Sequence, residues 1–508
     1  MRIADAQLTT LLAWLRATAA GAQLSSDSRT IKRGDVFFAY PGDTADGRDY
    51  IAQAIANGAA AVVVDAGGAA WDEQWTVPHV DVVDLKENAG PIASAYYGRP
   101  DAGMFAVAVT GTNGKTSCTQ WLGSAISRQG EPTVVVGTLG VGTFKSGQPQ
   151  QFNSTGYTTP DAVMLQRTLA AARDAGATVL AIEASSIGLH QHRLAGLHVD
   201  VALFTNFTRD HLDYHGDMQA YEAAKTMLFD WPGLRHAVVN LDDAMGERLV
   251  RRLQSKVGAV PVIGYTLVGK QVDGIDMVCA SDICSTATGT SFRIDSPYGA
   301  GAVKTRLIGD FNVSNVLGII GVLVAKGMPM REAIAAAETL TPVPGRMQLL
   351  GPQDGPMIVI DYAHTPDALQ KTLTSLRQVA RDRGGQLWCL FGCGGDRDPG
   401  KRPQMGVIAM AADHVVVTSD NPRFEEPAAV IGQIVAGMDS AGPAPRVIED
   451  RAAAILWTLR RAAKADVVLL AGKGHENYQE IKGRKLPFLD ADHVALGLAA
   501  RATMKGTG

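Results

Sequence analysis

The sequence has 508 residues, enough for about three domains of the usual 100–200 residues. Hydrophobic residues make up 46% and charged residues 19%, which is typical of a globular protein and excludes a chain that is disordered throughout. The formal net charge of −4 provides no basic field for the phosphates of nucleic acid, so we expect no nucleic-acid partner.

The first hundred residues alternate short apolar runs with a helical pattern. Residues 36–39 and 60–64 are predicted to form buried strands, with a helix at 50–57 between them. The segment Tyr97-Gly98-Arg99-Pro100 combines two residue types that interrupt regular structure. It predicts the end of a first domain spanning residues 1–100.

A second block of alternating strands and helices follows. Its apolar runs predict strands at 105–110, 133–137, 178–183, 199–205 and 236–240. This alternation indicates an α/β fold with a doubly wound, mostly parallel sheet. Residues 260–305 are richer in Thr, Ser and Gly and predict an antiparallel subsheet, and a helix is expected at 312–326.

The clearest linker is the segment from Thr341 to Arg346, which holds two prolines and a glycine and cannot continue a helix. It predicts a second domain at 101–343 and a third at 344–508. The third domain is again α/β, with buried strands expected at 357–360, 387–391, 414–418 and 467–470.

Neither disulfides nor membrane spans are expected. The five cysteines are an odd number and are widely spread, which is not typical of a disulfide framework and indicates a reduced, cytoplasmic protein. No apolar run reaches the roughly 18 residues of a spanning helix, so no membrane insertion is expected. Asp5 and Arg16 interrupt the apolar start of the chain, which argues against a signal peptide.

The strongest local motif is Gly111-Thr112-Asn113-Gly114-Lys115-Thr116, between a predicted strand and a predicted helix. Such a turn lets backbone N–H groups approach phosphates, with the lysine on the β/γ-phosphates and the threonine on Mg²⁺. The strict pattern has glycine where this chain has Val109, so the motif is a shortened variant. The alternative is an ordinary Gly-rich turn.

Three further features of the central block are candidates for a site. Glu183 ends a predicted strand, where a carboxylate could hold a metal ion or simply face solvent. The loop from Arg209 to Gly216 contains two histidines and two aspartates, although Mg²⁺ usually prefers oxygen ligands. Asn312 and Asn315 share one face of the predicted helix and could read an adenine edge or cap and solvate the helix.

Four polar loops follow the four predicted strands of the third domain. They are Asp361 to Pro366, Gly392 to Asp398, Asp420 to Arg423 and Ala471 to Glu476. The carboxyl ends of parallel strands meet at one edge of the sheet, so these loops are expected to form one site. Arg397 and Arg423 could bind carboxylates and Glu476 an ammonium group, which implies a zwitterionic ligand such as an amino acid.

In this order and spacing the motifs resemble the Mur ligase family, the ATP-dependent amide-forming enzymes of peptidoglycan synthesis. The resemblance covers nearly the whole chain. It is carried by Asp27-Ser28-Arg29, Gly111 to Thr116, Arg209 to Gly216, Asp361 to Pro366, Asp420 to Arg423 and Gly472 to Glu476.

The resemblance implies an N-terminal domain for a UDP-sugar, a central ATPase domain and a C-terminal Rossmann-like domain. It implies that ATP is bound by Gly111, Thr112, Asn113, Gly114, Lys115, Thr116, Asn312, Asn315, Arg346 and Asp361. It places Mg²⁺ on Thr116, Glu183, His211 and Lys225, the last of these as a carbamylated lysine. From the helical pattern alone, Lys225 would be a solvated surface residue.

The implied substrates are UDP-N-acetylmuramoyl-L-alanyl-D-glutamate and meso-2,6-diaminopimelate. The first would be held by Ser28, Thr158, Thr159, Ser185, Gln191 and Arg193. The second would be held by Arg397, Asp420, Asn421, Pro422, Arg423, Gly472 and Glu476. Two positions depart from the family pattern, Tyr157 where asparagine is expected and Ile187 where histidine is often found.

The implied reaction forms an acyl phosphate on the D-glutamate γ-carboxylate and then an amide with the amino acid. Lys115 and Lys225 are the expected catalytic residues, and His211 is a candidate base for the amine. A monomer is expected. The alternatives are a sister ligase using L-lysine, folate or another acid, a P-loop ATPase without ligation, and a dinucleotide oxidoreductase. Arg423 argues against L-lysine, which has no second carboxylate to pair with it.

Overall fold

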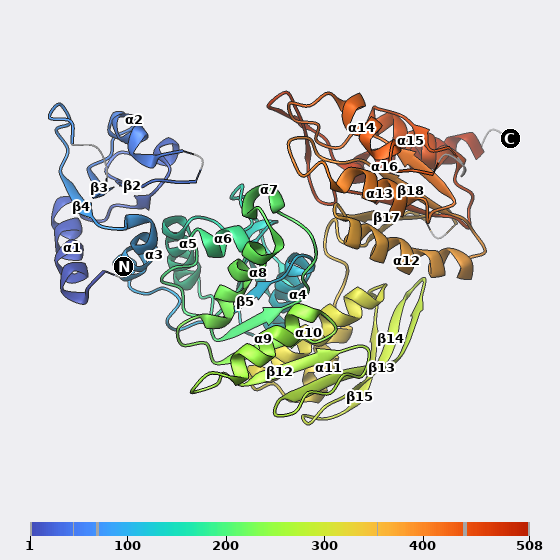
Figure 1. The fold of residues 1–508 in the computed structure, drawn as a ribbon, viewed down its shortest axis with the longest axis horizontal. Coiled ribbons are helices and arrows are strands. Elements are labelled where there is room, and N and C mark those ends of the chain that lie inside the picture. The colour runs from blue at the N-terminus through green and yellow to red at the C-terminus, as the bar shows by residue number, and fades with distance from the viewer. Residues whose placement is uncertain (1–2, 44, 68–70, 353, 440–443, 506–508) are drawn as a thin grey trace.

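The structure is a computed structural model that describes residues 3–505 except 44, 68–70, 353 and 440–443. Its three large sheets occupy successive stretches of the chain. Figure 1 shows the N-terminal part at one end, the C-terminal part at the other and the central sheet between them. The α/β fold is confirmed. No strand lies in residues 83–104 or 306–347, where we propose the domain boundaries.

The N-terminal part is a four-stranded parallel sheet with helices packed on it. Its elements are α1 (Asp5–Thr18), β1 (Leu24–Ser25), β2 (Val36–Ala39), α2 (Ile51–Ala56), β3 (Ala61–Asp65), β4 (His79–Val82) and α3 (Leu85–Tyr96). The two predicted strands are confirmed as β2 and β3. The predicted helix begins one residue later than expected, because a 3₁₀ turn at Gly47–Tyr50 precedes it.

The central part is built on an eleven-stranded sheet in the order β15-β14-β13-β12-β11-β10-β5-β9-β6-β7-β8. Its strands are β5 (Phe105–Thr110), β6 (Thr133–Gly137), β7 (Gly140–Lys145), β8 (Gln148–Pro149), β9 (Val179–Glu183), β10 (Val201–Phe204), β11 (His236–Asn240), β12 (Val262–Thr266), β13 (Asp276–Thr286), β14 (Gly289–Asp295) and β15 (Gly301–Thr305). All five strands predicted before residue 260 are present.

Helices cover both faces of the central sheet. They are α4 (Lys115–Arg128), α5 (Ala162–Asp174), α6 (Ser186–His190), α7 (Leu212–His215), α8 (Met218–Thr226), α9 (Ala244–Gln254), α10 (Asp310–Ala325) and α11 (Met330–Glu338). Strand β5 shows why: Val107 and Val109 pack with α4 and α10, whereas Ala106 and Ala108 face α5 and α9. The alternation along the strand therefore buries both of its faces.

The expectation for residues 260–305 was only partly right. Strand β12 pairs in parallel with both β11 and β13, so it continues the doubly wound sheet. Antiparallel pairing begins between β13 and β14 and continues to β15. These strands extend the same sheet and do not form a separate one, because the edge of β12 pairs directly with β13.

The C-terminal part has a six-stranded sheet in the order β16-β17-β21-β18-β19-β20 and a separate hairpin. Its strands are β16 (Gln348–Leu350), β17 (Met357–Asp361), β18 (Leu387–Phe391), β19 (His414–Val417), β20 (Arg446–Val447) and β21 (Val467–Ala471), and the hairpin is β22 (Tyr478–Ile481) with β23 (Arg484–Pro487). Its helices are α12 (Pro366–Asp382), α13 (Lys401–Ala409), α14 (Pro427–Val435), α15 (Arg451–Arg461) and α16 (Asp490–Lys505). The four predicted strands are confirmed.

Strands β17 to β21 are parallel, so the loops after them meet at one edge of the sheet, as the sequence predicted. In the part of the chain that the structure describes, no helix is long and apolar enough to cross a lipid bilayer.

Candidate active site

The turn after β5 is shaped by two glycines. Gly111 has φ +147°, and a Cβ there would lie 1.9 Å from the Thr205 hydroxyl oxygen. Gly114 has φ +88° and a Cβ would lie 2.7 Å from Oδ1 of Asn315. Neither position accepts a larger residue without a shift of its neighbours. Gly114 also begins α4 without a side-chain cap, so the first N–H groups of this helix are available to an anion.

Asn206, after β10, holds this turn in place. Its Oδ1 accepts from the Asn113 N–H at 2.9 Å, and its Nδ2 donates to the Asn113 carbonyl at 3.1 Å. Thr205 Oγ1 donates to the same carbonyl at 2.6 Å. The shape of the turn is therefore fixed by a neighbouring strand end as well as by its own glycines. Sequence reasoning did not single out Asn206.

Two lysines converge on one carbonyl oxygen. Lys115 Nζ donates to the carbonyls of Gly111 at 2.7 Å and Thr112 at 2.8 Å, and Lys225 Nζ donates to that of Gly111 at 2.9 Å. Burial lowers the pKa of both amines, and for Lys225 the charge of Lys115 lowers it further, to well below its usual value. Two buried cations at one carbonyl oxygen repel each other. This repulsion favours either an anion bound between them or the conversion of one of them to an anion.

Lys225 is not the solvated residue that its helix pattern suggests, since only 1% of it is exposed. It lies on α8, which packs against α6 and α7, and its Nζ lies 4.4 Å from the centre of the Tyr221 ring. The helical pattern did not predict this burial, because Lys225 faces the turn from Gly111 to Thr116, which we call the phosphate-type turn. The sequence pattern of α8 gives no information about the position of that turn.

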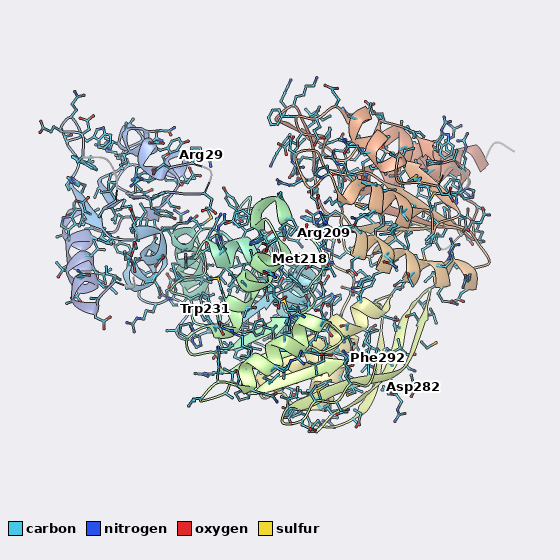
Figure 2. All side chains as sticks on the ribbon, viewed as in Figure 1. Arg29, Arg209, Met218, Trp231, Asp282 and Phe292 are labelled. Carbon is cyan, nitrogen blue, oxygen red and sulfur yellow. The ribbon has the colours of Figure 1, made fainter. Side chains whose placement is uncertain are left out.

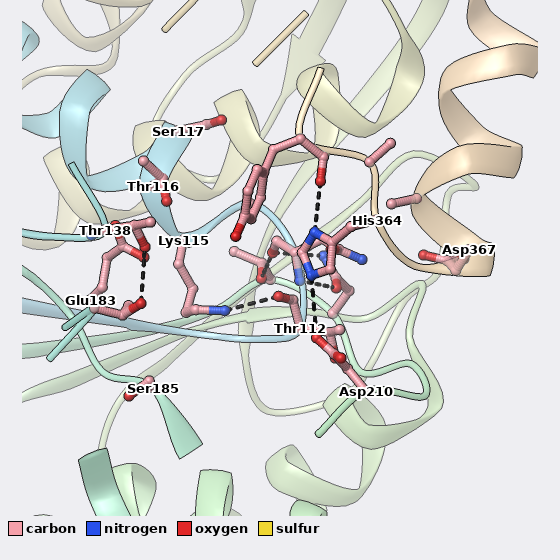
Figure 3. Close-up of a pocket in the computed structure, with 18 of the residues that line it drawn as sticks. Thr112, Lys115, Thr116, Ser117, Thr138, Glu183, Ser185, Asp210, His364 and Asp367 are labelled. Carbon is pink, nitrogen blue, oxygen red and sulfur yellow. Dashed lines mark hydrogen bonds and ion pairs between the residues drawn. The ribbon is translucent and has the colours of Figure 1, made fainter. Parts of the chain in front are cut away.

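Glu183 lies at the end of β9 and is almost fully buried beside the turn. Its two carboxylate oxygens accept from the Thr138 N–H at 2.8 Å and the Thr138 hydroxyl at 3.1 Å (Figure 3). Among the described residues, no three His, Cys, Asp or Glu side chains form a metal-binding group. Of the predicted Mg²⁺ ligands, Thr116, Glu183, His211 and Lys225 all line the same cavity.

This cavity has a volume of about 1270 Å³ and lies between the central sheet and the C-terminal part (Figure 3). Most predicted site residues line it: Thr112, Asn113, Gly114, Lys115, Thr116, Thr158, Thr159, Glu183, Ser185, Gln191, Arg193, His211, Lys225, Asn312, Asn315, Arg346, Asp361 and Arg397. The structure therefore brings together residues that are more than 280 positions apart in the chain.

Arg346 joins the C-terminal part to the phosphate-type turn. Its guanidinium donates to Thr116 Oγ1 at 3.4 Å and to His475 Nδ1 at 3.2 Å, and it lies 4.3 Å from the centre of the Tyr362 ring. Asp361, at the end of β17, accepts from the Met347 N–H at 2.7 Å. Burial raises the pKa of Asp361.

Another wall of the cavity is formed by polar side chains that are held by hydrogen bonds. Thr159 Oγ1 bonds the Ser185 hydroxyl at 2.8 Å and donates to the Glu183 carbonyl at 2.7 Å. Arg193 donates to the Thr159 carbonyl at 2.9 Å and lies 4.8 Å from the Tyr157 ring centre. Tyr157, the first departure from the family pattern, thus contacts Arg193, which is predicted to bind the substrate. Ile187, the second, also lines the cavity.

The central and C-terminal parts also meet through charged loops. Arg209 pairs with Asp398 at 3.1 Å, and Figure 2 shows Arg209 where these two parts approach each other. The Nε2 atom of His364 lies 3.9 Å from Asp210 Oδ2, while its Nδ1 donates to the Tyr362 carbonyl at 2.7 Å (Figure 3). Burial acts to raise the pKa of Asp210, but His211, His364, Lys401 and a hydrogen bond from the His211 N–H together outweigh it and lower the pKa to about 2.

The residues that are predicted to bind the amino-acid substrate form a second cluster, at the edge of the C-terminal sheet. Asn421 Nδ2 donates to Glu476 Oε2 at 2.8 Å, and Arg423 donates to the Gly395 carbonyl at 2.6 Å. Gly472, with φ +107°, lies against Asp420. Apart from Arg397, which lines the main cavity and lies 3.8 Å from Asp213, this cluster does not reach the cavity.

Ser28 lies outside this arrangement. It is buried in the N-terminal part, where its hydroxyl donates to Gln53 Oε1 at 3.0 Å, and it does not line the cavity. Asp43 of the same part does line the cavity, and its carboxylate accepts from Lys86, Gln191 and Tyr214. Burial acts to raise the pKa of Asp43, but these hydrogen bonds lower it to about 2. Asp43 was missed because its partners are distant in the sequence.

Comparison with known proteins gives matches along nearly the whole chain. Family models described as Mur ligase family, catalytic domain; Mur ligase middle domain; and Mur ligase, glutamate ligase domain match residues 22–97, 109–323 and 345–474. The UDP-N-acetylmuramoyl-L-alanyl-D-glutamate–2,6-diaminopimelate ligase of Janthinobacterium sp. (strain Marseille) is 66% identical over 97% of each chain. The protein of the same name from Pseudomonas aeruginosa is 45% identical over 94% of this chain and 95% of its own.

Solved structures agree with these matches. One with the same ligase name is 36% identical, covers 94% of this chain and 95% of its own, and has a TM-score of 0.65. A MurF ligase from Thermotoga maritima in complex with ADP is 18% identical, covers 95% of this chain and 98% of its own, and has a TM-score of 0.64, which shows a shared fold.

Proposed function

This chain belongs to the Mur ligase family, and we propose that it uses ATP to join meso-2,6-diaminopimelate to UDP-N-acetylmuramoyl-L-alanyl-D-glutamate. The observation that carries this proposal is the 66% identity over 97% of the chain to a ligase named for these two substrates. The site supports it independently, because the turn from Gly111 to Thr116 borders the main cavity and a cluster suited to a zwitterion lies outside that cavity, at the edge of the C-terminal sheet.

ATP is proposed to bind at the turn from Gly111 to Thr116. The free N–H groups at the start of α4 and the Lys115 ammonium would hold its phosphates. Arg346 already contacts Thr116, so it is placed to reach those phosphates from the C-terminal part. Asn315 lies directly over Gly114 and is proposed, with Asn312, to hold the adenine side.

The side chains beside Lys115 suit Mg²⁺, which prefers oxygen ligands. Glu183 supplies a buried carboxylate and Thr116 a hydroxyl, and His211 lines the same cavity. We propose that these residues, with Lys225 as its carbamate, hold the ion. When bound, Mg²⁺ would neutralise charge on the phosphates of ATP.

Carbamylation of Lys225 is supported by its surroundings. Burial and the nearby Lys115 lower the pKa of Lys225 to well below its usual value, which favours the neutral amine that adds to CO₂. The carbamate would replace a repelling cation by an oxygen anion beside Lys115. This accounts for two lysines at a single carbonyl oxygen.

The muramyl-dipeptide is proposed to lie along the wall formed by Thr158, Thr159, Ser185, Gln191 and Arg193. Arg193 carries a charge suited to a substrate carboxylate, and its bond to the Thr159 carbonyl holds it in place. The D-glutamate γ-carboxylate would attack the γ-phosphorus of ATP, giving an acyl phosphate and ADP. Lys115 would stabilise the charge that develops on the phosphoryl group.

The diaminopimelate amine would then attack the acyl carbon, form the amide and expel phosphate. The amino-acid cluster lies outside the main cavity, so this step calls for movement of the C-terminal part toward the central sheet. Closure would keep water from the acyl phosphate. The Arg209–Asp398 pair and Arg346 already connect the two parts and would guide that movement.

Arg423 is the proposed basis for choosing diaminopimelate over L-lysine. Its side chain is one-fifth exposed; it donates to the Gly395 carbonyl and makes a looser contact to Glu480 at 3.5 Å. A distal carboxylate would pair with this guanidinium, whereas L-lysine offers it no second carboxylate. We further propose that the enzyme acts as a monomer in the cytoplasm.

The test is phosphate release from ATP with Mg²⁺ and the UDP-muramyl-dipeptide, measured with meso-diaminopimelate, with L-lysine and with no amino acid. Release that requires meso-diaminopimelate supports the proposal. Release with L-lysine alone would replace it by a sister ligase. Release that is independent of any amino acid would instead indicate an ATPase without ligation.

A further inference from the structure

Lys473 is a charged side chain with no exposed surface. It follows β21, in the loop that carries Gly472 and Glu476. Its ammonium donates to Asn421 Oδ1 at 3.1 Å and to Glu476 Oε2 at 3.0 Å. Lysine is almost never fully buried unless it is paired, so these two contacts explain how the charge is tolerated.

The first contact fixes the amide of Asn421. Its Oδ1 accepts from Lys473 and also from the Glu480 N–H at 2.9 Å. Its Nδ2 donates to Glu476 Oε2 at 2.8 Å. Because the amide oxygen faces two donors and the amide nitrogen faces a carboxylate, a flipped Asn421 would lose all three hydrogen bonds.

The second contact orients Glu476. Its Oε2 accepts from both Lys473 and Asn421, whereas no hydrogen bond from a described residue reaches Oε1. The side chain is 16% exposed. The carboxylate is thus held by one oxygen, which leaves the other for a ligand.

Several charged or titratable groups surround Glu476. They are Lys473 in its own loop, Asp420 after β19, Tyr362 after β17, Tyr478 on β22 and Arg451 on α15. Burial and the charge of Asp420 raise the pKa of Glu476, and Lys473 acts in the opposite direction. Arg451 is itself paired with Asp490 inside the core, at 2.7 Å.

We propose that Lys473 is a positioning residue of the amino-acid site, which holds the Glu476 carboxylate and the Asn421 amide ready for the ammonium group of the incoming amino acid. Lys473 is fully buried and acts through Glu476 without touching the ligand. The inference rests on the proposed ligase function and adds a residue to its amino-acid site.

The test compares Lys473→Met with wild type. Methionine keeps most of the side-chain volume and removes the charge. The KM for meso-diaminopimelate is expected to rise at least about tenfold, because charge-assisted hydrogen bonds are lost. The KM for ATP is expected to stay within about twofold, since the contacts of Lys473 belong to the amino-acid cluster.

A pH profile separates positioning from packing. Without Lys473, the pKa of Glu476 rises further, so its ionised form is lost at higher pH. The acid limb of kcat/KM for the amino acid should therefore move to higher pH, by on the order of one unit. The matched control is Lys464→Met, which removes an exposed lysine of the same part and should change neither quantity.

A double-mutant cycle with Glu476→Gln makes the test decisive. If Lys473 acts through Glu476, then Lys473→Met/Glu476→Gln has about the same KM as Glu476→Gln alone. Additive effects, or a wild-type KM and pH profile in Lys473→Met, would overturn the inference. If Lys473→Met does not fold, Lys473→Gln takes its place in the same cycle. If wild type and Lys464→Met both lack phosphate release that depends on the amino acid, this result would instead refute the ligase function itself.

Discussion

Replacing Lys225 by methionine is expected to stabilise the protein in CO₂-free buffer and to abolish ligation. The nitrogens of Lys225 and Lys115 bond the same carbonyl oxygen, at 2.9 and 2.7 Å, so the two charges lie close together in a buried region. Keeping both amines charged at a separation of less than about 6 Å and an effective dielectric constant of about 20 costs about 3 kcal/mol. Lys225 avoids this repulsion only by releasing its proton on folding, which itself costs free energy.

Two favourable contacts of Lys225 are lost in the same substitution. The hydrogen bond to the Gly111 carbonyl contributes about 1 kcal/mol, and that carbonyl keeps its bond from Lys115. The contact with the Tyr221 ring contributes about 1 kcal/mol more. The net gain on removing Lys225 is therefore about 1 kcal/mol, equivalent to roughly 2–4 °C in the apparent melting temperature.

Thermal unfolding of both proteins, with and without bicarbonate, measures this. Bicarbonate should raise the melting temperature of wild type, because carbamylation binds CO₂ to the folded state, and should leave Lys225→Met unchanged. With ¹³C-bicarbonate, a carbamate signal is expected in wild type alone. A Lys225→Met protein that is less stable than wild type in CO₂-free buffer, or one that responds equally to bicarbonate, would refute the reasoning.

Three other substitutions test separate parts of the site. Gly114→Ala should weaken ATP binding by at least about tenfold in equilibrium dialysis, because its Cβ would meet Asn315 and its positive φ disfavours alanine; unchanged affinity would contradict the role of the turn. Arg423→Ala should raise the KM for meso-diaminopimelate by about 10- to 100-fold, with little change in the KM for ATP, because a partly buried ion pair to the carboxylate of the ligand is lost; equal effects on both KM values would count against it. Arg209→Ala should shift the melting temperature by less than about 2 °C, since its pair with Asp398 is partly exposed and contributes under about 1 kcal/mol; a larger shift would mean that this contact holds the two parts together.

Most of the fold could be predicted from local patterns. Buried parallel strands read as short apolar runs, and strands such as β5, β11 and β18 begin and end at the predicted residues. The extension of the central sheet by β13 to β15 could not be predicted in the same way. Whether these strands join a sheet or form another depends on pairing between edges, which no single-strand pattern records.

The candidate site was predictable where a motif dictates local geometry. The two glycines of the turn from Gly111 to Thr116 are examples, because the motif predicts a tight turn and both glycines have a positive φ there. Lys225 shows the limit: its helical pattern indicates a solvated residue, and its burial follows from the approach of another element. Asp43 and Lys473 show the same limit, since they contact Gln191 and Asn421, which lie elsewhere in the chain.

The most direct test of the proposed acyl-phosphate reaction is transfer of oxygen-18. The UDP-muramyl-dipeptide would carry the label in the γ-carboxylate of D-glutamate, and the released phosphate would be analysed by mass spectrometry. The predicted result is that each released phosphate carries one labelled oxygen. This labelled phosphate should form together with the tripeptide product, and only when meso-diaminopimelate is present. Unlabelled phosphate would mean that water attacks ATP directly, which would contradict ligation through an acyl phosphate at this site.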